Sequence, residues 1–127
     1  MKIEHFAYNV ADPVAVADWY VANLGMSVAR RMESGPRTHF LKDSSGQVMI
    51  EVYNNPPDEV PPYADMNPLI LHLAFVCDNP ESKRAELEKV GASFVEEVRL
   101  DDGSHLVMMR DPFGFSIQLC KRGEPML

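Results

Sequence analysis

The sequence predicts an α+β fold in which two tandem βαβββ modules form a curved, mostly antiparallel sheet around a central cavity. Three observations support this fold class. A strand, a helix and three further strands are indicated twice along the chain, a proline-rich segment separates the two occurrences, and polar residues recur at equivalent positions of both. We therefore expect residues 1–127 to form one domain made of two similar halves.

The first predicted module spans residues 2–53. Alternation of polar and apolar residues indicates a strand at 2–9. A helix is expected to start at Asp12-Pro13 and to end at Gly25, because aspartate caps a helix, proline suits its first turn and glycine suits its end. We expect its apolar stripe to consist of Val14, Trp19, Val21 and Leu24. Three further strands are indicated near residues 27–33, 37–42 and 47–53.

Residues 54–68 form a predicted linker. Five of the ten prolines fall within thirteen consecutive positions, at Pro56, Pro57, Pro61, Pro62 and Pro68. Prolines at this density exclude a helix interior or a central strand. The second module follows at residues 69–121. It repeats the first, with a strand at 69–77, a helix opening at Asn79-Pro80, and strands near 93–99, 104–110 and 115–121.

The two modules also match at single residues. The run that starts at His5 corresponds to the run that starts at His72, and Glu51 and Gln118 follow these histidines at the same separation of 46 positions. A duplicated unit explains this spacing better than a generic α+β chain with a coincidental pattern, and two copies are the minimum for a repeat.

Composition limits the classes of partner. The chain has twelve basic and nineteen acidic residues and a net charge of −7, so a dedicated nucleic-acid or anionic-membrane binder is not expected. Its two cysteines form no CxxC pair, which excludes a disulfide scaffold or a zinc ribbon. The sequence shows no signal peptide and no apolar run approaching ~18 residues, so the expected location is the cytoplasm.

Four polar residues stand out in the predicted strands. Alternation points Glu51 and Gln118 into the concave face, and His5 and His72 hold equivalent places, His72 within an apolar stretch. A divalent metal would satisfy all four, because two imidazoles, a carboxylate and an amide oxygen suit Zn²⁺, Ni²⁺, Co²⁺, Fe²⁺ or Mn²⁺. The alternative is that each histidine is an isolated core residue hydrogen-bonded to the backbone.

At these residues the sequence resembles the vicinal oxygen chelate superfamily, which includes glyoxalase I, bleomycin-resistance proteins, extradiol dioxygenases and methylmalonyl-CoA epimerase. The resemblance covers residues 2–121 and rests on the paired modules, the Asp111-Pro112-x-Gly114 turn and the ligand positions. Matched residue by residue, it implies that the metal ligands are His5, Glu51, His72 and Gln118. Bacterial glyoxalase I is closest in ligand types, but it has glutamate where this chain has Gln118.

The resemblance implies a metal-dependent lyase or isomerase that acts on a small substrate with vicinal oxygens through an enolate-type intermediate. Glu51 is then a ligand and the candidate catalytic base, while Tyr53 and Arg110 are candidate substrate-binding residues. The alternatives are a metal-free binding protein of the bleomycin-resistance type and an extradiol-type dioxygenase, whose carboxylate ligand takes the position that Gln118 occupies here. The resemblance implies a homodimer. Surface positions are expected for His39 and His105.

Overall fold

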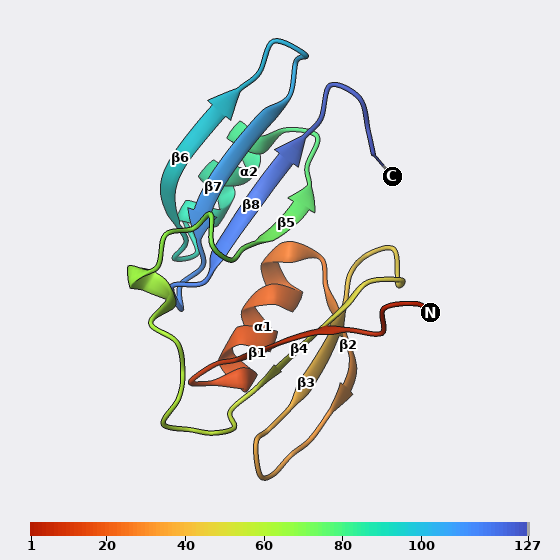
Figure 1. Ribbon diagram of the computed structural model, residues 1–127, viewed down its shortest axis with the longest axis vertical. Coiled ribbons are helices and arrows are strands. Elements are labelled where there is room, and N and C mark those ends of the chain that lie inside the picture. Colours follow the sequence, from red (N-terminus) through yellow and green to blue (C-terminus); the bar gives the residue numbers. More distant parts are fainter. Residues whose placement is uncertain (127) are drawn as a thin grey trace. The chain divides into compact units, whose positions relative to one another are not determined.

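The computed structural model describes residues 1–126 of the chain and shows an α+β fold (Figure 1). The chain divides into two compact units, of which the first is Met1–Pro61 and the second begins at Pro62, so the division falls inside the proline-rich segment. Each unit contains one βαβββ module with a four-stranded mixed sheet. The predicted fold class is confirmed.

The first module contains β1 (Phe6–Asn9), α1 (Pro13–Leu24), β2 (Ser27–Arg31), β3 (His39–Lys42) and β4 (Met49–Tyr53). Its sheet has the order β1-β4-β3-β2, in which β1 and β4 are parallel and the other pairs are antiparallel. The helix forms where its caps predict. Asp12 Oδ1 accepts hydrogen bonds from two backbone N–H groups of the first turn, and Gly25 ends the helix at a φ of 67°.

The predicted apolar stripe of α1 is wrong in part. The buried residues of this helix are Pro13, Val16, Ala17 and Tyr20, which follow the i, i+3, i+4, i+7 spacing of one helical face. Val14 and Val21 are 36% and 41% exposed. Tyr20 alone is large and fully buried, so its ring fixes which face of α1 lies on the sheet.

The second module contains the same elements, preceded by a short 3₁₀ turn at Tyr63–Asp65. They are β5 (Leu73–Val76), α2 (Pro80–Glu88), β6 (Ser93–Arg99), β7 (His105–Arg110) and β8 (Ser116–Lys121). The sheet order is β5-β8-β7-β6, again with one parallel pair, β5 with β8. Asn79 caps α2 by accepting a hydrogen bond from the Ser82 N–H, as its position before Pro80 predicts.

The strand predicted at 69–77 is shorter than expected. Asn67 organises a turn instead, because its side chain accepts from the Leu69 N–H and its carbonyl accepts from the Ile70 N–H. Leu69 and Ile70 are 65% and 72% exposed, so His72 lies directly before β5 and not within a buried apolar strand.

Each sheet has one face toward its helix and one face away from it. In the first module Ile50 and Val52 are buried on the helix face, and Glu51 points to the other face. In the second module Ile117 and Leu119 are buried in the same way, and Gln118 points to the opposite face. No helix among residues 1–126 is long and apolar enough to cross a membrane.

Candidate metal and substrate site

The first module brings His5 and Glu51 into direct contact. Glu51 lies in the middle of β4, between Ala7 of β1 and Phe40 of β3. His5 directly precedes β1, and its Nε2 is 3.1 Å from Glu51 Oε2. The other ring nitrogen, Nδ1, is 2.9 Å from Glu4 Oε2, and the ring edge faces Phe40 at a centroid distance of 5.5 Å. Two of the four predicted ligands, His5 and Glu51, are therefore in contact within this module, and their role as metal ligands stays a prediction.

The geometry of this pair fits two ligands of one metal ion. Nitrogen and oxygen ligands bind such ions at about 2.0–2.2 Å, so two ligand atoms at a right angle are roughly 3 Å apart. The 3.1 Å between His5 Nε2 and Glu51 Oε2 has this value. Ligating histidines also commonly donate their second ring N–H to a carboxylate, which is the contact that Glu4 offers to Nδ1.

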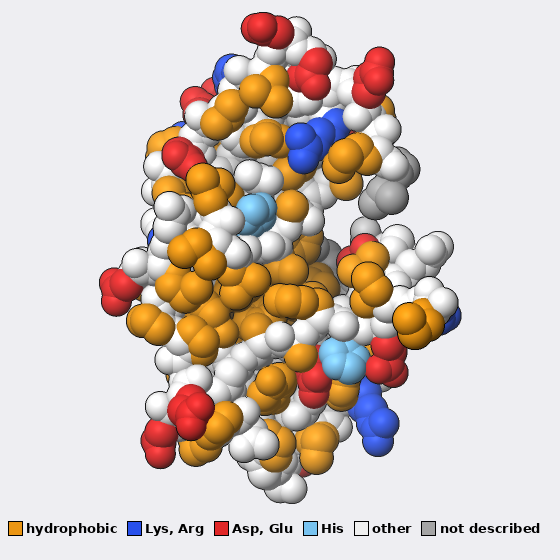
Figure 2. Space-filling model, viewed as in Figure 1, with side chains coloured by type: hydrophobic (Ala, Val, Ile, Leu, Met, Phe, Trp, Pro, Cys, Tyr) orange, Lys and Arg blue, Asp and Glu red, His pale blue; other side chains and the backbone are white. Residues whose placement is uncertain are grey.

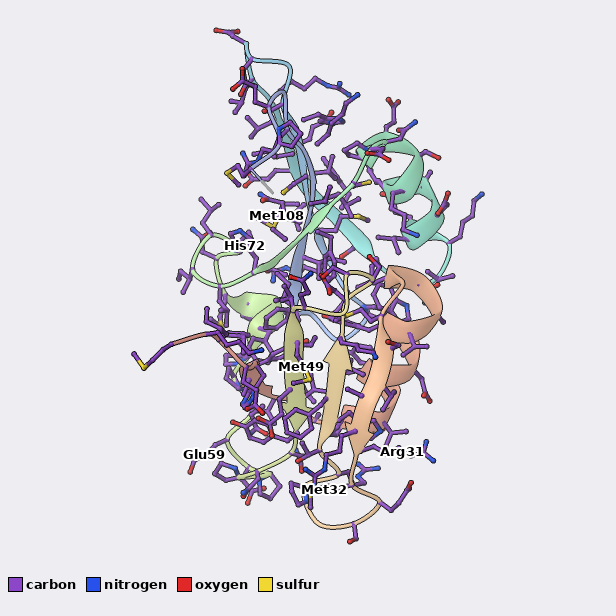
Figure 3. All side chains as sticks on the ribbon, turned by 90° about the vertical axis from the view of Figure 1, so that its right-hand side faces the viewer. Arg31, Met32, Met49, Glu59, His72 and Met108 are labelled. Atoms are coloured by element: carbon purple, nitrogen blue, oxygen red, sulfur yellow. The ribbon has the colours of Figure 1, made fainter. Side chains whose placement is uncertain are left out.

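The second module places His72 and Gln118 in equivalent positions. Gln118 pairs with Ala74 of β5 and Met108 of β7, just as Glu51 pairs with Ala7 and Phe40. His72 Nδ1 is 3.0 Å from the carbonyl oxygen of Pro68. A carbonyl only accepts hydrogen bonds, so Nδ1 carries a proton, and in the neutral imidazole this leaves Nε2 as the nitrogen that can bind a ligand. Figure 3 labels His72 and Met108 in this module.

Cys120 is a further polar neighbour that sequence reasoning did not identify. It lies two residues after Gln118 on the same strand face, and its Sγ donates to Gln118 Oε1 at 3.1 Å. Burial raises the pKa of the Cys120 thiol, which keeps the sulfur protonated and able to donate. The strand alternation was a signal for this contact, because residues i and i+2 of a strand share a face.

Two of the four predicted ligands therefore lie on each module, and His5 and Glu51 of the first module are in direct contact. Among residues 1–126 no group of three or more histidine, cysteine, aspartate and glutamate side chains is arranged to hold a metal ion. The fit to a metal rests on the His5–Glu51 distance and on the contact of His72 Nδ1 with the Pro68 carbonyl.

Comparison with known proteins decides the family. The family model described as Glyoxalase/Bleomycin resistance protein/Dioxygenase superfamily matches residues 2–119. The chain belongs to this superfamily. The match spans both modules and includes all four candidate ligands, so the predicted resemblance is confirmed. No curated protein matches the sequence.

Solved structures of the superfamily fold are similar over almost the whole chain. A glyoxalase family protein from Enterococcus faecalis is 27% identical, with a TM-score of 0.71 and coverage of 94% of this chain and 97% of that one. TnmS3, an antibiotic binding protein from Streptomyces sp. CB03234, is 18% identical, with a TM-score of 0.73 and 96% coverage of both chains. A lactoylglutathione lyase from Agrobacterium tumefaciens is 20% identical, with a TM-score of 0.67 and coverage of 94% and 92%.

The two predicted substrate-binding residues of this superfamily member differ in their surroundings. Tyr53 ends β4 on the same face as Glu51 and is partly exposed. Arg110 shares a face with Met108 and Gln118, and its guanidinium donates hydrogen bonds to backbone carbonyl groups. Its Nη1 is 2.7 Å from the Tyr63 carbonyl oxygen and its Nη2 is 2.6 Å from that of Met66. A substrate contact stays a prediction for both residues.

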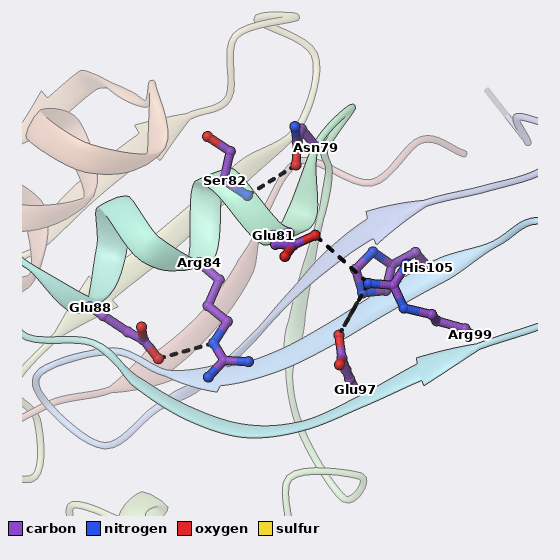
Figure 4. A network of polar contacts seen from close by, with 8 residues as sticks. All are labelled: Asn79, Glu81, Ser82, Arg84, Glu88, Glu97, Arg99 and His105. Carbon is purple, nitrogen blue, oxygen red and sulfur yellow. Dashed lines mark hydrogen bonds and ion pairs between the residues drawn. The ribbon is translucent and has the colours of Figure 1, made fainter.

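The surface position expected for His39 and His105 is wrong. They are 6% and 7% exposed and lie on the helix faces of their sheets. His39 Nδ1 is 2.8 Å from the Arg37 carbonyl oxygen. His105 Nε2 is 2.8 Å from Glu97 Oε2, within a network of charged side chains that joins β6, β7 and α2 (Figure 4).

The His105 contact predicts a pH dependence of stability. The hydrogen bond with His105, and then the nearby Arg99, hold the pKa of Glu97 below its ordinary value of 4.5. A carboxyl whose pKa is lower in the folded state stabilises that state fully above the unfolded value and loses this effect as the pH falls through the folded value. Glu97→Gln is therefore expected to lower the melting temperature at neutral pH, by a margin that narrows below a pH of about 4.5.

Thermal denaturation of both proteins between about pH 3 and about pH 7 measures this margin. Glu96→Gln is the matched control, because it removes the same charge one position earlier on β6 and outside the His105 contact. A margin for Glu97→Gln that stays constant across the series would show that the pair contributes nothing to the pH dependence.

Proposed function

We propose that this superfamily member is a metal-dependent lyase or isomerase of the glyoxalase I type, acting on a small substrate with vicinal oxygens. The observation that carries the proposal is the convergence of His5 Nε2 and Glu51 Oε2 at 3.1 Å. The equivalent register of Gln118 beside Ala74, and the contact of His72 Nδ1 with the Pro68 carbonyl, support it. Similarity to a lactoylglutathione lyase structure agrees with this reaction class.

In this proposal each module supplies two ligands to a divalent ion, His5 with Glu51 and His72 with Gln118. The two modules belong to one chain or to two copies in a homodimer. A bound ion supplies Lewis-acid polarisation of a substrate oxygen. Glu51 is the carboxylate that takes a proton from the substrate carbon, because the fourth position holds an amide that cannot act as a base.

The remaining residues orient this machinery. Glu4 holds the His5 ring through Nδ1, and Pro68 holds the His72 ring in the same way. Cys120 donates to Gln118 Oε1 and so fixes the amide. In this proposal the Tyr53 hydroxyl, two residues after Glu51 on the same strand face, hydrogen-bonds a substrate oxygen.

A metal-free small-molecule binding protein is the second candidate. It is favoured by the way the polar groups satisfy one another, because His5 contacts Glu51 and Glu4, and Gln118 accepts from Cys120. One similar structure is an antibiotic binding protein, which agrees with this alternative.

Metal content separates the two candidates. Protein purified without a chelator or an affinity tag is expected to hold about one ion per chain by elemental analysis. Adding Ni²⁺ or Zn²⁺ to the stripped protein, at about 100 times the dissociation constant, should raise the melting temperature by about 10 °C. His5→Gln and His72→Gln should each remove most of that rise.

His105→Gln is the matched control. His105 belongs to the sheet of the second module, but it lies on the helix face and not on the face of Gln118. This change should lower the melting temperature and leave the metal-induced rise intact. Negligible metal in the native protein, together with an unchanged melting temperature on metal addition, would contradict the enzyme proposal and favour the binding protein.

A further inference from the structure

The second module contains a pocket at the ends of β5 and β8. Its volume is about 300 Å³, and it lies beneath the segment that follows β8, where Pro125 and Met126 form part of its wall. Figure 1 shows this segment at the same end of the module as the end of β5. All lining residues belong to the second module, so the pocket is complete within that unit.

The duplicated architecture allows the pocket to be compared with the same place in the first module. The Val10 N–H donates to the Tyr53 carbonyl at 2.8 Å, and the Cys77 N–H donates to the Cys120 carbonyl at 2.9 Å. These equivalent bonds align the ends of β1 and β4 with the ends of β5 and β8. Asn9 therefore corresponds to Val76.

In the first module, side-chain hydrogen bonds join the end of β1 to the residues that follow β4. Asn9 Nδ2 donates to the Pro56 carbonyl at 2.7 Å, and the Asn55 N–H donates to Asn9 Oδ1 at 2.8 Å. Asn54 Nδ2 also donates to the Val10 carbonyl. The chain that leaves β4 is thus bound to the end of β1 by side-chain amides.

The second module has no side-chain amides at the equivalent positions, which are Val76, Lys121 and Arg122. Val76 stands where Asn9 stands in the first module and has no side chain that can bind the departing strand. It is 85% exposed, and the pocket opens beside it. Together with Ala74, Phe75 and Met126, which also line the pocket, Val76 gives it an apolar wall.

The lining combines an apolar wall with basic groups. The apolar part and the thiols come from Ala74, Phe75, Val76, Cys77, Cys120, Pro125 and Met126. Lys121, Arg122 and one acidic residue, Asp78, also line the pocket. Hydrogen bonds from Ser104, and then the charge of the nearby Arg122, lower the pKa of the Asp102 carboxyl. Among residues 1–126, Lys121 and Arg122 take part in no ion pair. Figure 2 shows Lys or Arg side chains beside hydrophobic ones at this end of the module.

We propose that this pocket binds a small apolar carboxylate. The apolar body lies against Val76 and Met126, and the carboxylate faces Lys121 and Arg122. The chain as a whole is acidic, with a net charge of −7, but this pocket is lined by two basic residues. These residues favour an anionic over a neutral ligand. The pocket volume suits a small ligand.

The pocket also adjoins the candidate site. Ala74 lines the pocket and pairs with Gln118, and Cys120 lines it and donates to Gln118 Oε1. A carboxylate bound here would therefore lie beside a proposed metal ligand. The binding itself needs no metal, so it stands or falls separately from the proposed function.

Calorimetric titration of the full chain with octanoate, in the presence of a chelator, tests the proposal. We expect saturable binding of one octanoate per chain, with octanol bound about tenfold more weakly. Lys121→Gln combined with Arg122→Gln should remove this preference and leave octanol binding unchanged. Val76→Asn, which restores the first-module residue, should weaken both ligands about fivefold.

Matched controls come from the first module. Arg30→Gln combined with Arg31→Gln removes the same charge from exposed positions of β2, and Val28→Asn makes the same change at an exposed valine of that strand. Both should bind octanoate like the unaltered chain. An absence of saturable octanoate binding, equal affinity for octanoate and octanol, or equal losses in the control variants would each overturn the proposal.

Discussion

Replacing Arg110 with methionine is expected to lower the free energy of unfolding by about 3 kcal/mol. The guanidinium binds the carbonyl oxygens of Tyr63, Met66 and Gly114 and the hydroxyl of Ser116, at distances between 2.6 and 3.1 Å. Methionine keeps much of the apolar stem but leaves these acceptors without a donor. The loss is large because Arg110 is partly buried and several acceptors depend on one side chain.

Urea unfolding of the variant measures this effect, with Arg99→Met as the control. Arg99 has a 61% exposed side chain with long ion-pair contacts, so its replacement should change the free energy by less than about 0.5 kcal/mol. Arg110→Lys should be intermediate, because an ammonium cannot reach acceptors on two sides of a planar fork. If Arg110→Met is as stable as Arg99→Met, the hydrogen bonds of Arg110 do not contribute to the free energy of unfolding, and this prediction is wrong.

Replacing Gln118 with glutamate is expected to raise proton-transfer activity on a hemithioacetal by about 100-fold. The change supplies a second carboxylate beside the substrate, which the amide cannot replace as a base. The β8 backbone already presents this position between Ala74 and Met108, and Cys120 would donate to the new carboxylate as it does to the amide. Initial rates with added Ni²⁺ or Zn²⁺ measure the gain.

Gln47→Glu is the control, because it adds the same charge at an exposed position that precedes β4. It should leave the rate unchanged. If Gln118→Glu produces no more activity than Gln47→Glu while metal binding is retained, the lack of a second carboxylate does not limit the reaction, and the result argues against glyoxalase chemistry for this chain.

The repeat and the helix starts were predictable because they depend on local signals. Asp12 and Asn79 cap their helices through backbone groups two or three residues away, so a short stretch of sequence contains the whole interaction. The equal spacing of His5 to Glu51 and of His72 to Gln118 also marked equivalent strand positions, which the sheet registers reproduce.

The features that were missed depend on contacts that spacing does not encode. The buried face of α1 is set by how Tyr20 packs on the sheet, and apolar valines on the other side gave a competing pattern. The turn at Asn67 interrupts a stretch whose composition favours a strand, because one side chain accepts a backbone hydrogen bond there.

The partners of the candidate ligands were likewise beyond the sequence. Pro68 orients His72 through a carbonyl group, which every residue type possesses and no pattern reveals. Arg110 was a candidate for substrate binding, but two of its acceptors, the carbonyl groups of Tyr63 and Met66, lie 47 and 44 positions away in a segment predicted to be a simple linker.

Residues of that segment lie outside the repeated pattern but contact the second module. The repeated sequence pattern starts after the prolines, yet Tyr63 and Met66 are bound by Arg110, and a Cβ at Gly114 would lie 2.8 Å from the Cβ of Ala64. Gly114 therefore leaves room for Ala64, a residue that lies outside the repeat. The second compact unit begins at Pro62, and it includes contacts with Tyr63, Ala64 and Met66 that lie outside the repeated pattern.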